Sequence, residues 1–227
     1  ETSLGIELGP RYREKTGLWA ADASFFLTHF NDLLVIDNVG GAGQSEVTEN
    51  VGEVRAMGIE FAIEADGQRL FDLPFANPWY GAVTLTDTEL LNDSRSTDAE
   101  SIFAGGVKGN KVPYIPDLAF NIGTGIEVGR FGLYLNGAYM DEMFTSASNT
   151  TDLVDGAGTP DSRFGKTESY FLLDLSARYR ATDGVTLFAG VQNALDDDYL
   201  VTRHPHGARS GQPLFAYIGM EIDLGSE

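Results

Sequence analysis

The sequence contains no cysteine among its 227 residues. This absence excludes a disulfide framework and any metal site built on thiolates, and it leaves the redox compartment open. The sequence also lacks a run of about 18 apolar residues, which excludes a transmembrane helix. It does not exclude a membrane location, because the strands of a membrane β-barrel give a much weaker hydropathy signal.

Positive charge is scarce. The chain has 15 Lys and Arg against 34 Asp and Glu, a net charge of −19. Nucleic acid is therefore excluded as a partner, since its phosphates would be repelled, and the surface suits cations instead. A Gly-x-Ser-x-Gly elbow and nucleotide-binding fingerprints are missing too. We expect no catalytic residues, no cofactor and no enzyme activity.

The sequence is instead rich in alternation of apolar and polar residues. Between positions 214 and 224 every second residue is apolar, and such a period of two places the two sets on opposite faces of a β-strand. The same pattern predicts about nine strands. They span residues 3–9, 19–28, 57–64, 79–88, 118–128, 131–139, 171–179, 185–191 and 214–224.

Long alternating segments with small and charged residues between the apolar ones are typical of an antiparallel transmembrane β-barrel. Its apolar face meets lipid, and its other face lines an aqueous lumen. The residues expected in that lumen are Glu7, Asp22, Glu60, Glu64, Glu127, Asp174 and Arg178. If Ile59, Phe120, Leu173 and Ile218 were instead packed in a dry interior, this interpretation would fail.

The predicted connections alternate in length. Residues 15–17, 129–130 and 181–184 form short turns and 66–78 a longer one, whereas 37–48, 92–112, 145–167 and 193–212 form long polar loops. Short turns at one end and long extracellular loops at the other are the outer-membrane arrangement. Aromatic residues beside the short turns are expected to form an interfacial girdle. They are Tyr12, Trp19, Trp79, Tyr80, Phe131 and Tyr179.

An odd number of strands is a problem for a closed barrel, because an open sheet leaves two edges of unpaired backbone groups in hydrocarbon. Either the count is wrong by one and the barrel is small and closed, or the chain is the last part of a larger barrel.

Several motifs bear on this choice. Residues 50–60 (Asn-Val-Gly-Glu-Val-Arg-Ala-Met-Gly-Ile-Glu), the opening residues 1–12 and the Val-Pro-Tyr-Ile-Pro-Asp segment 112–117 resemble the C-terminal half of TonB-dependent outer-membrane receptors. The most specific stretch is 191–199, with its Asn-x-Leu-Asp-x-x-Tyr element, followed by the Gly/Pro-rich residues 207–213 and a final strand. Within that family the order of motifs is most similar to ferric citrate-type receptors.

The resemblance implies that residues 1–224 are the C-terminal segment of a barrel of about 22 strands, with 225–227 as a short tail. Such receptors bind scarce metal chelates outside a Gram-negative cell and import them with energy from the TonB complex. The implied partners are outer-membrane lipid, the remaining strands, an N-terminal plug that fills the lumen, the TonB complex through that plug, and a ferric chelate such as ferric citrate or a siderophore. We expect the plug to be absent from this chain, which begins without a methionine and so is processed or a fragment.

One cationic cluster stands in the last long loop. Arg203, His204, His206 and Arg209 lie within seven residues of an acidic chain, and guanidinium groups grip carboxylates bidentately. We therefore expect these four residues to contribute to ligand binding. The alternative is that the arginines pair with Asp196, Asp197 and Asp198 and only order the loop. Two histidines without a third ligand do not predict a metal site, and the three aspartates are expected to form a solvated turn.

Two other classes of protein remain open. A self-contained barrel of about eight or ten strands, acting as an adhesin, protease or pore, would pair its first strand with its last. A soluble extracellular β-sandwich that binds a ligand would need no detergent.

Overall fold

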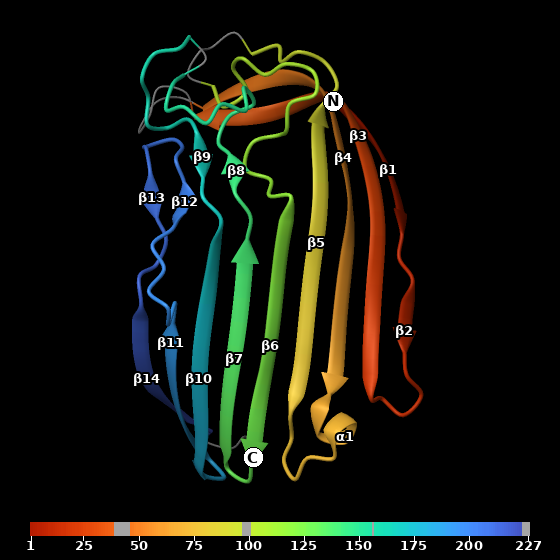
Figure 1. The fold of residues 1–227 in the computed structure, drawn as a ribbon, viewed down its shortest axis with the longest axis vertical. Coiled ribbons are helices and arrows are strands. Elements are labelled where there is room, and N and C mark those ends of the chain that lie inside the picture. Colours follow the sequence, from red (N-terminus) through yellow and green to blue (C-terminus); the bar gives the residue numbers. More distant parts are fainter. Residues whose placement is uncertain (39–45, 97–100, 156, 224–227) are drawn as a thin grey trace.

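The computed structural model describes residues 1–38, 46–96, 101–155 and 157–223, and these form one long, curved antiparallel sheet (Figure 1). Its strands follow one another in chain order, and all nine predicted strands are present. They are β1 (Thr2–Leu8), β3 (Trp19–Asn38), β4 (Glu46–Asp66), β5 (Pro78–Leu90), β6 (Leu118–Val128), β7 (Phe131–Met140), β10 (Tyr170–Thr182), β11 (Val185–Gln192) and β14 (Phe215–Ile222).

A tenth strand, β2 (Arg11–Arg13), was not predicted. It continues β1 along the same neighbour, β3, after an interruption at Gly9 and Pro10. Proline has no backbone N–H to donate, and it is tolerated here because β1 and β2 form the edge of the sheet.

The register of the strands separates an apolar face from a polar one. Leu8, Phe25, Ile59 and Leu85 are direct neighbours on successive strands and lie on the apolar face. All seven charged residues expected in the lumen lie on the other face; Glu60, for example, is opposite Ser24 and Thr84. The prediction of two faces of opposite chemistry is confirmed.

The apolar face has no protein packed on it within the described residues. Ile218 is 85% exposed and Ile59 42% exposed, and Phe120 and Leu173 are only partly covered by their neighbours. These four side chains therefore do not lie in a dry protein interior, as the interpretation of the sheet as a membrane β-barrel requires. On β4 this face runs from Met57 to Ala65, a length of about 26 Å at a rise of roughly 3.3 Å per residue. It is bounded above by the ion pair between Arg55 and Glu89.

Glycines on the polar face accommodate aromatic rings from the neighbouring strand. A Cβ atom on Gly123 would lie 2.2 Å from the Tyr80 ring, so the ring covers the space where a side chain would be. The same relation holds for the opposed pairs Gly58 and Phe26, Gly125 and Tyr134, Gly190 and Tyr217, and Gly219 and Phe188.

The predicted interfacial girdle is wrong for one residue, Tyr80, which lies on the polar face. Tyr12, Trp19, Trp79, Phe131 and Tyr179 lie on the apolar face, but Tyr80 lies opposite Gly123 on the polar face. The phenol donates a hydrogen bond to Asn136 Oδ1 over 2.8 Å. Tyr80 directly follows Trp79, and adjacent residues of a strand point to opposite faces.

The connections follow the expected asymmetry: long loops gather at the upper end in Figure 1 and short turns at the lower end. The loops contain the short pairs β8 (Met143–Phe144) with β9 (Lys166–Thr167) and β12 (Leu200–Thr202) with β13 (Arg209–Ser210). The longer turn contains an unpredicted helix, α1 (Gly67–Phe71). No helix in the described ranges has the length and apolar character needed to span a membrane.

The loop expected over residues 37–48 is shorter than predicted, because β3 continues to Asn38 and β4 begins at Glu46. The predicted end of the last strand at Leu224 and the predicted tail 225–227 lie outside the described residues. The predicted loops 37–48, 92–112 and 145–167 lie outside them in part.

The hydrophobic core lies at the loop end of the sheet and not along its length. Val51 and Leu90 are fully buried there, together with Val54, Phe103 and Ala147. Two of these residues come from loops and three from the upper ends of β4 and β5. The loops are thus folded over the polar face of the sheet and have an interior of their own.

Candidate functional site

The long loops form one hydrogen-bonded assembly at the upper end of the sheet. Ala147 N donates to Ile102 O over 2.7 Å, and the amide of Asn149 both accepts from Lys111 N and donates to Lys111 O. Residues 92–112 and 145–167 are therefore joined through their backbones. The assembly presents the ordered surface that faces outward from this end of the sheet.

Tyr114 connects this assembly to the last loop. Its hydroxyl accepts hydrogen bonds from the backbone N–H groups of Arg203 (3.2 Å) and His204 (3.1 Å) and lies 3.0 Å from His204 Nδ1. The backbone N–H of Tyr114 donates to Phe144 O. Sequence reasoning missed this role of Tyr114, although its position between Pro113 and Pro116 is the one available signal of a fixed conformation.

Arg203 is held by main-chain oxygens. Its Nε donates to Lys166 O over 2.7 Å and a terminal nitrogen to Ser162 O over 3.2 Å. The ring of His204 packs edge-on against Phe164, with 5.0 Å between centroids. Both side chains therefore fix the last loop against residues 162–166.

His206 and Arg209 have a different environment, since both are exposed. Arg209 belongs to β13 and pairs with Thr202 of β12, which gives its backbone a defined position. Among the described residues no ion pair joins Arg203 or Arg209 to Asp196, Asp197 or Asp198. The four residues predicted to bind ligand thus lie on one loop. The side chains of Arg203 and His204 pack against the other loops, whereas those of His206 and Arg209 are exposed.

The three aspartates belong to a turn that joins three strands. Asn193 Nδ2 donates to the carbonyls of Asp197 and Gln212, and Asp197 Oδ2 accepts from Phe171 N. Asp196 Oδ1 accepts from Leu214 N over 3.0 Å. Carboxylates occupied by backbone N–H groups are structural, and no group of three or more possible metal ligands occurs in the part of the chain that the structure describes.

Asp161 is the most strongly held carboxylate of the loops. It accepts hydrogen bonds from the backbone N–H and guanidinium of Arg163, with distances of 2.5 to 3.1 Å, and both side chains are mostly covered. The hydrogen bond from the Arg163 side chain lowers the pKa of Asp161 below its usual value.

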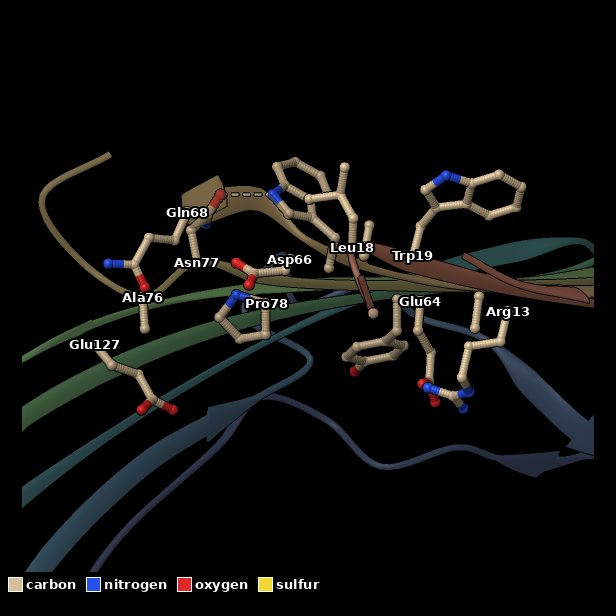
Figure 2. A pocket seen from close by; sticks show the side chains of 15 residues that line it. Arg13, Leu18, Trp19, Glu64, Asp66, Gln68, Ala76, Asn77, Pro78 and Glu127 are labelled. Carbon is tan, nitrogen blue, oxygen red and sulfur yellow. Dashed lines mark hydrogen bonds between the residues drawn. The ribbon is translucent and has the colours of Figure 1, made fainter. Parts of the chain in front are cut away.

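A cavity of about 580 Å³ lies at the opposite end, where the turns are short (Figure 2). Figure 2 shows Trp19 on one side of the sheet and Arg13, Glu64 and Glu127 on the other. Trp79 Nε1 donates to Asn77 Oδ1 over 2.6 Å in its wall. The cavity is open and carries charges of both signs, so it marks the mouth of the polar face.

This geometry defines a class of protein: a wall of an outer-membrane β-barrel, with lipid on the apolar face, a wet polar face and folded extracellular loops. A family model described as "TonB dependent receptor-like, beta-barrel" matches residues 1–194. The chain belongs to this family of TonB-dependent receptors, whose members are transporters of the Gram-negative outer membrane and not enzymes.

Solved structures of receptors have the same fold. The ferric yersiniabactin uptake receptor FyuA from Yersinia pestis is 21% identical with a TM-score of 0.69, and the match covers 98% of this chain and 30% of FyuA. The ferric citrate transporter FecA is 21% identical with a TM-score of 0.74 (97% and 31% covered). The siderophore receptor PiuA from Acinetobacter baumannii is 19% identical with a TM-score of 0.70 (97% and 28% covered).

The chain thus spans less than a third of the length of these receptors. No curated protein matches it in sequence.

Proposed function

We propose that this chain supplies part of the barrel wall and extracellular loops of a TonB-dependent receptor that binds and imports a ferric chelate. The main support is the match of the barrel family model to residues 1–194. Within the described residues, the two edge strands of the sheet, β1 and β14, have no partner on their outer sides. The remaining strands, the plug and, through the plug, the TonB complex would complete the transporter.

The proposed cargo is a ferric complex with carboxylate groups, such as ferric citrate or another siderophore. Support comes from Arg209 and His206, which are exposed in the last extracellular loop of a strongly acidic chain. A guanidinium provides paired N–H donors for a carboxylate, so Arg209 is the proposed direct contact. Arg203 and His204 would act by holding that loop in place through Lys166 and Tyr114.

The experiment is a titration of the complete receptor with ferric citrate, followed by intrinsic fluorescence. Replacing Arg209 by alanine should raise the Kd about tenfold, because a charge-assisted hydrogen bond contributes about 1.5 to 3 kcal/mol. The matched control is Arg130→Ala, which removes an arginine from the turn between β6 and β7 at the other end of the barrel. Equal affinity of the Arg209→Ala receptor and the parent would reject this site.

A further inference from the structure

The turn that contains α1 is more apolar than its neighbours at the same end of the sheet. The residues from 70 to 75 read Leu-Phe-Asp-Leu-Pro-Phe. Leu70 is 45% exposed and Phe71 64% exposed. We call these two side chains the apolar tip of α1. The turns between β6 and β7 and between β10 and β11 carry no comparable tip.

The turn is held rigidly. Asp66 caps α1 by accepting from Arg69 N, and the Arg69 guanidinium donates to the carbonyl and the hydroxyl of Thr16 over 2.9 Å each. Further along, Ala76 and Glu127 exchange two backbone hydrogen bonds. Contacts to the β2–β3 turn and to β6 therefore fix α1 from both sides.

The helix that carries the apolar tip begins at the aromatic edge of the lipid-facing surface. A Cβ atom on Gly67, the first residue of α1, would lie 2.7 Å from Trp79 Cδ1, so the helix begins against that indole. Trp79 and Trp19 both lie opposite Ala65 on the apolar face, and the ring of Tyr12 lies 4.9 Å from that of Trp19. Figure 1 places α1 at the end of the sheet with the short turns.

We propose that the apolar tip of α1 inserts into the periplasmic leaflet and that its occupant is phospholipid. Aromatic residues at a barrel rim lie at the headgroup level, and a surface that continues from them meets the same lipid. Arg69 precedes Leu70 in α1, and Lys15 precedes Thr16, which accepts the two hydrogen bonds from Arg69. These two cationic side chains suit phosphate groups in a chain that is otherwise acidic. The proposal rests on the outer-membrane location of the family and not on the identity of the cargo.

The test uses the complete receptor in liposomes of phosphatidylethanolamine and phosphatidylglycerol. This chain has no cysteine, so the substitution Phe71→Cys provides a single site in it for a polarity-sensitive fluorophore. Any cysteine elsewhere in the receptor is first changed to serine. Asp183→Cys, in the polar turn between β10 and β11, is the matched control at the same end of the barrel. Compared with the label at 183, the label at 71 should emit at shorter wavelength. Lipids with a nitroxide near the headgroup should quench it about twofold more strongly than the label at 183.

Two results would overturn the proposal. Equal emission and quenching at positions 71 and 183 would mean that the tip is in water. A blue-shifted label at 71 that lipid nitroxides do not quench would mean that protein covers the tip, either another part of the receptor or a periplasmic partner. Leu70→Cys provides a second position with the same expectation, in case labelling at 71 disturbs folding.

Discussion

At the scale of single residues, glycine determines how the polar face is built. The opposed glycine and aromatic pairs let rings lie flat across the neighbouring strand, where a Cβ atom would collide with them. Gly123 and Tyr80 show the consequence most directly. The ring covers the glycine, and its hydroxyl reaches Asn136 on β7. The Tyr80 side chain thereby bridges from β5 across β6 to β7.

We predict that Gly123→Ala destabilises the receptor by about 1 to 3 kcal/mol, because the Tyr80 ring must leave its position. Thermal unfolding in detergent measures the effect. Gly5→Ala is the control, since a Cβ there has an ordinary contact of 3.5 Å with Thr28. Adding Tyr80→Ala to the Gly123→Ala receptor should recover part of the loss, and an unchanged loss would contradict the collision.

Acid should weaken the loop around Asp161. The Arg163 hydrogen bonds lower its pKa in the folded state, so their stabilisation is complete above the usual carboxyl value of 3.8 and is lost as the pH falls through the lowered pKa. We predict that amide protection factors of Arg163 and Phe164 are constant above pH 5 and fall in acid. Asp161→Asn should show reduced protection above pH 5, and protection there equal to that of the parent would refute the role of the ion pair.

At the scale of elements, the nine strands and their faces follow from the sequence because a period of two is a local signal. The same rule predicts the position of Tyr80, because Tyr80 directly follows Trp79 and must point to the opposite face. Its closeness to a turn suggested the girdle instead. The helix α1 was not predictable in this way, since five residues are too few for a helical period. Nor did any local pattern indicate that loops share an interior.

In the candidate site, too, the sequence predicts the local feature but not the contacts between distant residues. The cationic loop is visible in the sequence, but the partners of its side chains are distant along the chain. Arg203 binds carbonyls near residue 165 and His204 contacts Tyr114. Composition suggested the neighbouring aspartates as partners, but Asp196 and Asp197 instead accept backbone N–H groups at the base of the loop.

We predict that Leu90→Ala loosens the loops without opening the barrel. Leu90 is fully buried in the loop core, and its truncation should cost about 2 to 4 kcal/mol through the cavity it leaves. Proteolysis of intact cells should then cleave residues 92–112 or 145–167 faster, while the barrel stays in the membrane. Leu85→Ala, on the apolar face of the same strand, is the control and should not expose the loops.

At the scale of the whole molecule, strand direction limits how this sheet can be closed into a barrel. Each strand on the path from β1 to β14 is antiparallel to the next and there are nine of them, so β1 and β14 run in the same direction. Figure 1 shows that β1 begins at the upper end of the sheet and β14 ends at the lower end. An all-antiparallel barrel cannot be closed by pairing these two edges. If the proposed receptor forms a closed, all-antiparallel barrel, its remaining part would contribute an odd number of strands between these edges.

Cross-linking tests this arrangement. Cysteines at Thr186 and Glu221, which are direct partners on β11 and β14, should form a disulfide in the assembled receptor. Cysteines at Glu7 and Glu221, on the two edge strands, should not. A disulfide between positions 7 and 221 would favour a small closed barrel and would contradict the assignment of this chain to a larger wall.

The shared interior of the extracellular loops limits how these loops can diversify. Phe103 and Ala147 come from two different loops and pack with Val51 and Leu90 in one cluster. A change in one loop therefore demands a matching change in another. Variation should concentrate at exposed positions such as Val107 and Leu153, which have no part in that cluster.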